Sequence, residues 1–276
     1  MSVIKRFAAA CLILLIFSCA TETIKIYSFN IQIFGVSKMS KPEVVDVLVK
    51  IISGADVTAV QEVRSAGADP VTQFMSLLPP AYRHVIGPRE GRGRSKEQYW
   101  VIYNSEKLTV RDCAVWPDPD DIFERNPFAV YFQTKDKFDF ILINNHIQPS
   151  AAAAEIEALP GLVSYFQELW NEPDVLVAGD FNADGAYYDE SLLETIFPKE
   201  KYLTVITNEY DTTVAESENT YDRIIITSSA REDFTGKFGV IRFHEVYEFS
   251  RYAITPKEVS DHYPVWAEFR LDKDTD

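Results

Sequence analysis

Apolar and polar positions along this chain of 276 residues form many short strand-like runs and few helical ones. The runs are rich in β-branched and aromatic residues and are bounded by Gly, Pro, Asn and Asp, as strands are. We expect strands at 24–29, 57–63, 82–86, 99–103, 108–115, 128–132, 138–144, 175–178, 204–207, 223–227 and 265–270. Strands do not alternate regularly with helices, which argues against a doubly wound parallel sheet. The pattern favours an α/β (α+β) fold in which mixed sheets are covered by helices.

Three segments have helical periodicity. Ser40 is expected to cap a helix that has Pro42 in its first turn, because serine accepts from free N–H groups and proline lacks one. Residues 71–78 predict a short helix, and residues 151–170 predict a long one. Pro160, followed by a glycine, is expected to kink or divide the long helix.

Residues 1–19 have the features of an export signal. A positive start at Lys5 is followed by an apolar run, 7–17, that is too short to span a bilayer comfortably. The run ends at Cys19 in a sequence that resembles a bacterial lipobox, so Cys19 is the expected lipidation site. We expect an exported, membrane-anchored bacterial lipoprotein, with full secretion as the alternative. Residues 20–276 contain no linker-like stretch and are expected to form a single domain.

Cysteine content and charge limit the function further. If the signal is cleaved and Cys19 is lipidated, Cys113 is left alone, so no internal disulfide is expected. Cys113 lies in an expected strand and is interpreted as a small core residue. The net charge of −15 excludes a protein that coats nucleic acid through bulk positive charge. An enzyme acting on a polyanion would need local positive charge and metal ions.

Polar residues gather where the expected strands end. They occur at Asn30, 61–64, 144–146, 179–182, 221–223 and 260–262. If these ends meet at one rim, the site holds carboxylates, amides and two histidines. Oxygen ligands of this kind suit Mg²⁺, Mn²⁺ or Ca²⁺ and are poor for zinc. Hydrolysis of a phosphodiester requires this combination, because a cation offsets phosphate charge while a base and an acid handle the protons.

These motifs resemble those of the endonuclease/exonuclease/phosphatase superfamily, and within it those of deoxyribonuclease I. The resemblance rests on 29–31, 34–35, 38–40, 61–64, 179–184, 211–213, 221–224 and 260–264, in this order, and runs from about Ile24 to Arg270. It implies a four-layer sandwich in which two packed mixed β-sheets are flanked by helices. It also implies an endonuclease that uses Mg²⁺ or Mn²⁺, with Ca²⁺ as a further ion.

The resemblance implies a role for each matching residue. His262 would be the general base oriented by Asp222, and His146 the general acid oriented by Glu97. The metal region would be formed by Glu62, Asn30, Asp180 and Asp261. Asn182 and Arg125 would contact the scissile phosphate. Arg64 would contact the minor groove of DNA. A carboxylate beside each imidazole fixes its tautomer and stabilises its charged form.

Two loops depart from the family pattern. Ser95 stands where the relative has a tyrosine that stacks on a sugar, and Arg92 and Arg94 belong to a run of cations around it. We expect these arginines to track DNA phosphates, with a solvated turn as the alternative. Asp211 and Thr213 match a second calcium loop, in which Ala215 replaces a threonine and weakens the expectation.

Several residues also have purely structural interpretations. Asp180 and Asn182 could form a turn after a strand. Asp261 and His262 could cap or fill a loop, and Arg125 could be a surface ion pair. Two further histidines, at 84 and 244, match no motif and are interpreted as structural or exposed.

Three functions remain open from the sequence. The first is a monomeric DNA endonuclease with no protein partner. The second is a phosphodiesterase or phosphatase for lipid head groups or other small phosphoesters. The third is an inactive surface lipoprotein that binds a partner. The arginine-rich loop favours DNA as the substrate.

Overall fold

The computed structural model describes residues 22–135, 137–271 and 274. The predicted signal segment, with Cys19, lies outside these residues. Six strands form a first sheet in the order β11-β12-β1-β2-β4-β3. Their bounds, in that order, are Phe234–Val240, Val265–Arg270, Thr23–Phe34, Val57–Val63, Gln98–Asn104 and Tyr82–Ile86. The sheet is mixed, because β1 pairs with β2 in parallel and with β12 in antiparallel orientation.

A second sheet of six strands has the order β5-β6-β7-β8-β10-β9. The bounds are Leu108–Val115, Phe128–Thr134, Asp139–His146, Val175–Asp180, Asp222–Thr227 and Tyr202–Thr204. This sheet is also mixed, since β7 and β8 are parallel whereas β8 and β10 are antiparallel.

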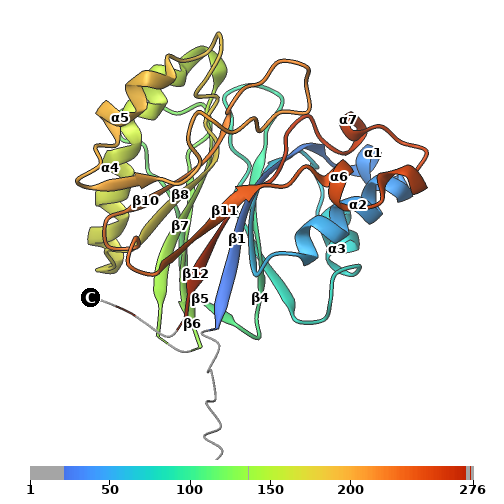
Figure 1. Ribbon diagram of the computed structural model, residues 1–276, viewed down its shortest axis with the longest axis horizontal. Coiled ribbons are helices and arrows are strands. Elements are labelled where there is room, and N and C mark those ends of the chain that lie inside the picture. Colours follow the sequence, from blue (N-terminus) through green and yellow to red (C-terminus); the bar gives the residue numbers. More distant parts are fainter. Residues whose placement is uncertain (1–21, 136, 272–273, 275–276) are drawn as a thin grey trace, which may run out of the picture.

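Helices cover the outer faces of both sheets (Figure 1). The first sheet is flanked by α1 (Val36–Met39), α2 (Pro42–Ser53), α3 (Asp69–Met75), α6 (Phe243–Val246) and α7 (Pro256–Val259), and the second by α4 (Ala152–Trp170) and α5 (Leu193–Ile196). Short 3₁₀ turns lie at Pro149–Ala151, Glu190–Leu192 and Phe249–Arg251.

Three apolar clusters hold the four layers together. One lies between the sheets and includes Ile26, Val101 and Leu142. A second joins the first sheet to its helices through residues such as Leu48, and a third joins the second sheet to α4 through residues such as Ile156. Layers with one apolar face each must bury it against a neighbour, which gives this arrangement. The predicted four-layer sandwich of two mixed sheets is confirmed.

Two expectations about helices are wrong. Lys41, not Ser40, is the N-cap of α2, and Ser40 instead donates from its hydroxyl to Ser37 O at the end of α1. Helix α4 continues unbroken past Pro160. Proline removes one hydrogen bond, but apolar residues on both sides of it, such as Ile156 and Val163, bury the same helix face and keep the helix continuous.

The expectations about strands also need correction. Cys113 is exposed and not part of the core. It lies on β5, an edge strand whose register shifts between Val110 and Asp112, so the alternation of inward and outward side chains is interrupted there. Strand β11 was not predicted, and β9 lies a little before the predicted 204–207.

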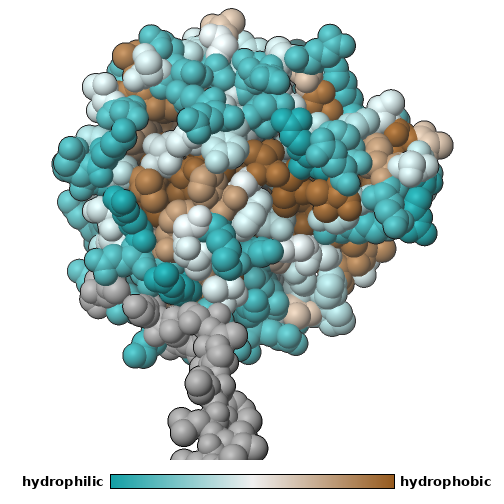
Figure 2. All heavy atoms as spheres, viewed as in Figure 1, coloured by the Kyte–Doolittle hydropathy of each residue, from teal (hydrophilic) through white to brown (hydrophobic). Residues whose placement is uncertain are grey.

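Hydrophobic side chains are also visible at the surface of the sandwich. Figure 2 shows them across the middle of one face, over the edge strand β11, whose Phe234, Phe238 and Val240 are partly buried against the core. Within the described part of the chain, no helix has the length and apolar character needed to cross a membrane.

Strand direction places the polar motifs at one end of the molecule. Strands β1 and β2 run in the same direction, as do β7 and β8, so their carboxyl ends form a rim at the end where β1 leads into α1 (Figure 1). Two buried amides join the sheets below this rim. Gln61 Nε2 donates to Asn144 Oδ1 at 2.7 Å, and Asn144 Nδ2 donates to Val60 O at 3.1 Å.

Candidate active site

His262 and Asp222 form a buried pair at the rim. The imidazole Nδ1 lies 2.7 Å from Asp222 Oδ2. Burial raises the pKa of Asp222 to about 6, although the charge of His262 opposes the shift. Burial alone would lower the pKa of His262, but the charges of Asp222 and Asp180 outweigh it and raise that pKa to about 10. Near neutral pH the shared proton therefore resides on the imidazole.

His146 and Glu97 form a second buried pair, with Nδ1 of the imidazole 2.8 Å from Glu97 Oε2. Burial opposes ionisation of Glu97. The hydrogen bond from His146 and the charges of His146, Arg125 and Arg64 are together stronger and lower the pKa of Glu97 to about 2. A carboxylate held on Nδ1 orients the ring and leaves Nε2 free to face the rim.

The two imidazoles face the same carboxylate. Nε2 of His146 and Nε2 of His262 each lie 3.5 Å from Asp180 Oδ2. The chain thus brings two histidines, each backed by its own carboxylate, to one anionic oxygen. A substrate phosphate at this place could receive a proton from one ring and have water deprotonated by the other.

Asn30 links the two carboxylates of the predicted metal region. Its Nδ2 donates to Asp180 Oδ2 at 3.0 Å and to Glu62 Oε1 at 3.3 Å. Glu62 has a positive φ of 63° and accepts from Ile33 N through its other oxygen. Asp261, the fourth predicted ligand, lies at the edge, half exposed and 3.9 Å from His262 Nε2.

The donors of this region suit a hard divalent cation. No cluster of three or more His, Cys, Asp or Glu side chains arranged to hold a metal occurs in the ranges that the structure describes. Mg²⁺ does not require one, since it usually keeps several waters and binds one or two carboxylates together with substrate phosphate. The carboxylates of Glu62 and Asp180, with the amide of Asn30 between them, match that requirement.

Backbone geometry at the end of β8 depends on Gly179 and Asn182. Gly179 has φ of 156°, and a Cβ there would lie 2.0 Å from Asn145 O, so only glycine fits. Asn182 adopts the left-handed φ of 46°, which asparagine tolerates better than most residues. Its Nδ2 donates to Ile147 O at 2.9 Å, which brings this predicted phosphate contact next to the loop after His146.

Arg64 is bound to two carboxylates of the site. Its NH2 lies 3.0 Å from Glu62 Oε2 and 2.9 Å from Glu97 Oε1, and its NH1 donates to Ser95 Oγ. The side chain is 30% exposed, so only part of it can reach a ligand. The predicted minor-groove residue therefore also connects the metal region to the acid pair.

Arg125 is buried rather than a surface ion pair. Its Nε donates to His146 O at 3.1 Å, its NH2 donates to Gln148 Oε1 at 3.3 Å, and its NH1 lies 3.7 Å from Glu97 Oε1. A buried guanidinium beside the acid histidine supplies the local positive charge that an acidic protein needs to hold a phosphate.

The arginine-rich loop begins and ends at a short bridge. Glu90 and Glu97 exchange two backbone hydrogen bonds, so the loop is attached directly to the acid pair. Arg92 and Arg94 are exposed on it. Arg92 is paired with Asp121 at 3.0 Å.

An arginine from outside the predicted second calcium loop pairs with its aspartate. Asp211 Oδ1 accepts from the backbone and hydroxyl of Thr213, and Asp211 Oδ2 is paired with Arg242 at 3.2 Å. The guanidinium already offsets the charge of Asp211.

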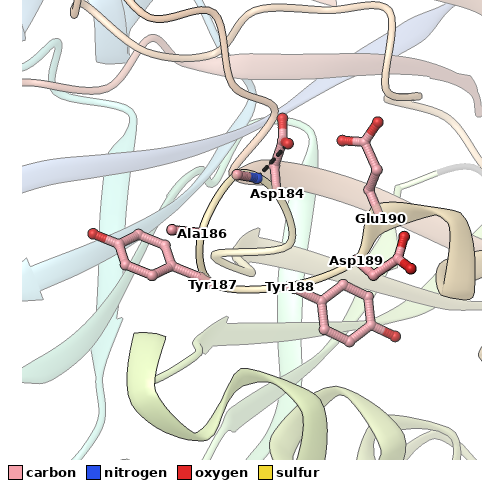
Figure 3. A pocket seen from close by; sticks show the side chains of 7 residues that line it. Asp184, Ala186, Tyr187, Tyr188, Asp189 and Glu190 are labelled. Carbon is pink, nitrogen blue, oxygen red and sulfur yellow. Dashed lines mark hydrogen bonds between the residues drawn. The ribbon is translucent and has the colours of Figure 1, made fainter.

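The loop after Asn182 lines an open hollow. Figure 3 shows the carboxylates of Asp184 and Glu190 on one part of this loop and the ring of Tyr187 on another. Tyr187 is 45% exposed, and its ring lies 5.5 Å from that of Tyr221, which lies 6.3 Å from that of His262. An aromatic row thus leads from His262 to solvent, which no sequence pattern had indicated.

Lys38 and Ser260 also support the site without having been predicted. The buried Nζ of Lys38 donates to Ile31 O and Val259 O, and burial lowers the pKa of Lys38 to about 8. Ser260 Oγ donates to Asn30 O and accepts from His262 N. Both residues lie in motifs that matched the family, which was the only signal available.

The remaining two histidines lie outside this arrangement. His84 Nδ1 accepts from Trp100 Nε1 at 2.9 Å, and His244 packs against Tyr263 with ring centroids 5.5 Å apart. Their contacts agree with the structural interpretation.

Comparison with known proteins assigns the family. The sequence profile of the Endonuclease/Exonuclease/phosphatase family matches residues 27–262. The chain belongs to this family. Among its relatives, mouse deoxyribonuclease-1-like 2 is 33% identical over 257 residues, covering 90% of this chain and 92% of the relative. Chicken deoxyribonuclease-1 is 33% identical over 258 residues, covering 88% and 91%.

Solved structures of the endonuclease/exonuclease/phosphatase family share the fold. A family protein from Bacteroides thetaiotaomicron superposes with a TM-score of 0.63 at 16% identity, covering 93% of this chain and 99% of that one. At that identity the likeness concerns the fold alone. The sequence relatives and the family profile together make this chain a deoxyribonuclease I-like enzyme of the phosphodiesterase class.

Proposed function

We propose that the chain is an exported, divalent-metal-dependent endonuclease that hydrolyses DNA phosphodiester bonds by a two-histidine acid and base mechanism. The observation that carries the proposal is the convergence of His146 and His262 on Asp180, each ring backed by its own carboxylate. Two of the relatives named above are deoxyribonucleases, which favours DNA as substrate.

In this proposal His146 donates the proton to the leaving oxygen and His262 accepts one from water. A cation held by Glu62 and Asp180 would offset charge on the phosphate oxygens. His262 must be neutral to act as a base, so its pKa must fall from about 10 in the working enzyme. A cation bound to Asp180 would offset the charge that raises the pKa of His262, and would therefore lower that pKa.

The substrate would be held by the cations around the two pairs. Arg125 and Asn182 lie on either side of the loop after His146 and are proposed to contact the scissile phosphate. Arg64, Arg92 and Arg94 are proposed to contact the flanking DNA. The exposed positions of Arg92 and Arg94 favour this, because neutralising phosphates requires cations that reach solvent.

Export and anchoring are part of the proposal. The support is the pattern of residues 1–19, which ends in the lipobox-like Cys19. The described chain starts at Glu22, whose carbonyl accepts from Leu271 N at the end of the sandwich opposite the rim (Figure 1). A lipid on Cys19 would therefore leave the active site facing away from the membrane.

Plasmid cleavage tests the enzyme activity. We expect nicking of plasmid with Mg²⁺ and none with excess chelator. His146→Ala and His262→Ala should each lower the rate by about 10²–10⁴-fold, because acid and base groups contribute about that much. His84→Ala is the matched histidine control and should cut normally.

Two outcomes would count against the proposal. If both site variants cut plasmid at the wild-type rate, the histidine mechanism is wrong. If the wild type spares plasmid but hydrolyses bis-p-nitrophenyl phosphate, the enzyme acts on small phosphoesters instead of DNA.

A further inference from the structure

Glu155 is a buried carboxylate that no sequence motif had indicated. It lies in the first turn of α4, and its side chain is completely inaccessible to solvent. Its Oε1 accepts from the backbone N–H of Glu124, and its Oε2 accepts from that of Gln148, both at 2.9 Å. These donors belong to two separate loops, one between β5 and β6 and the other between β7 and α4.

Each of the two loops holds or directly adjoins a residue of the active site: Arg125 lies in the first, and His146 ends β7 just before the second. Arg125 directly follows Glu124, and His146 comes two residues before Gln148. Arg125 closes the gap between the loops, because its Nε donates to His146 O at 3.1 Å and its NH2 to Gln148 Oε1 at 3.3 Å. The carboxylate of Glu155 therefore lies behind the place where the phosphate-binding arginine and the acid histidine meet.

Only a carboxylate can accept a hydrogen bond from both backbone N–H groups through two separate oxygens at this site. Burial of a charge is costly unless it is hydrogen-bonded, and it raises the pKa of Glu155. The two backbone N–H groups and the nearby charges of Arg125 and His146 act in the opposite direction. An amide has only one acceptor oxygen and would direct its NH₂ group at one of the two backbone donors.

We propose that Glu155 is a positioning residue that sets the distance and orientation of Arg125 relative to His146. The inference rests on the proposed function, since it concerns how the same site is aligned. Glu155 does not touch the reacting atoms; it acts through the two loops. The alternative is that the carboxylate serves only to stabilise the start of α4, where a negative charge is favourable.

Tyr99 is a second link between the two loops, and it remains when the link through Glu155 is removed. The hydroxyl of Tyr99 donates to Arg125 O at 3.3 Å and accepts from His146 N at 3.0 Å. Glu155→Gln, which has almost the same volume, should therefore fold with the loops still in contact but misaligned.

The main test compares Glu155→Gln with a matched control. We expect kcat/KM for plasmid and for bis-p-nitrophenyl phosphate to fall at least about tenfold, because a displacement of about 1 Å can cost about a hundredfold. Glu172→Gln is the control: Glu172 is also buried and accepts from a backbone N–H, that of Asp174, but it follows the other end of α4. It should lose thermal stability to a similar degree and keep its activity.

A double-mutant cycle separates positioning from general destabilisation. If Glu155 acts through Arg125, then Glu155→Gln should have a much smaller effect in an Arg125→Ala background than in the wild type. Full additivity of the two losses, or an unchanged kcat/KM in Glu155→Gln alone, would overturn the inference.

A spectroscopic measurement keeps the inference testable if the proposed function fails. In ¹⁵N-edited spectra of the histidine rings, Glu155→Gln should move the signals of His146 and leave those of His262 in place. Glu172→Gln should move neither. A wild type that hydrolyses no phosphodiester would contradict the proposed function, whereas unmoved His146 signals in Glu155→Gln would contradict the positioning role.

Discussion

At the scale of single residues, ionic contacts hold the site together, because some charged side chains lie between two groups of opposite charge. Arg64 is the clearest case, because its guanidinium bridges Glu62 and Glu97. Two carboxylates are thus kept close without a large electrostatic cost. Asp180 is the opposite case, an anion between two imidazoles.

The role of Arg64 can be measured with two substrates. If it aligns Glu62 and Glu97, Arg64→Ala should lower hydrolysis of both plasmid and bis-p-nitrophenyl phosphate by roughly tenfold to a hundredfold. If it only contacts flanking DNA, plasmid cleavage alone should fall. Arg83→Ala is the control, because Arg83 is exposed and its NH1 donates to Pro80 O and Tyr82 O.

Glu97 should make folding stability depend on pH in the acid range. Its pKa is lowered from 4.5 to about 2 in the folded chain, so the unfolded chain binds a proton first as pH falls. The stabilisation is complete above about pH 5, is lost progressively as pH falls towards 2, and amounts to about 3 kcal/mol. In urea titrations, Glu97→Gln should be less stable at neutral pH and lose less stability between pH 5 and pH 3. An equal slope in both proteins would contradict the assignment.

At the scale of elements, strand ends carry many groups of the site, such as His146 and Asp180, whereas loops carry its arginines. The ends of a loop determine how its residues act. The arginine-rich loop starts at Glu90 and returns at Glu97, so its tip and the acid pair share one anchor. Arg89 is not free to bind a ligand, because its NH1 donates to Ser65 O and its NH2 to Lys96 O. The exposed cations of the tip, Arg92 and Arg94, are therefore the ones that we propose to contact DNA.

Salt dependence tests this loop. Arg92→Ala with Arg94→Ala should weaken binding of duplex DNA and reduce the slope of log affinity against log salt by roughly one to two, because cations that neutralise phosphates release counterions. Arg94→Ala alone should reduce affinity and salt slope more than Arg92→Ala alone, since Arg92 must first break its ion pair with Asp121 to bind a phosphate.

The control for the loop removes the same charge elsewhere. Lys199→Ala with Lys201→Ala removes two exposed cations just before β9. They lie at the end of the second sheet that is away from the rim, where Tyr202 pairs with Thr227. This variant should bind DNA with an unchanged slope. If it matches the loop variant, the effect is one of net charge, and the loop is a solvated turn.

At the scale of the whole molecule, three arginines gather at the rim of a chain that is acidic as a whole. The chain has a net charge of −15, yet Arg64, Arg92 and Arg125 gather near the two histidine pairs. Each of these arginines is paired with a carboxylate, so under the proposed function a bound divalent cation would be needed as well to attract a polyanion to the rim.

Anchoring is the prediction that belongs to this scale. In a bacterial host, Cys19→Ala should move the protein from the membrane fraction to the soluble fraction, because lipidation requires that thiol. Cys113→Ala is the matched control, since Cys113 is an exposed cysteine on β5 and should leave the distribution unchanged. Labelled fatty acid that fails to attach to the wild type would exclude the lipoprotein, while export could still occur by ordinary cleavage.

Local patterns were sufficient for much of the fold. Strands were predicted because β-branched and aromatic runs bounded by turn residues are a property of neighbouring positions. The motif that ends β8 is different, because the steric reason for glycine at Gly179 is a contact with Asn145 on the neighbouring strand β7. The errors at Ser40, Pro160 and Cys113 arose where packing or an interrupted register overrode a local preference.

The sequence by itself determined which chemical groups are present and roughly which strand ends carry them. Only the tertiary structure decided which of these groups meet. Asn30 and Asp180 are 150 positions apart, and their hydrogen bond depends on how the two sheets pack. Glu155 could not be distinguished in sequence from any other glutamate on a helix, because its burial and its two backbone donors come from distant loops. Long-range contacts of this kind depend on packing of whole layers, which no local pattern encodes.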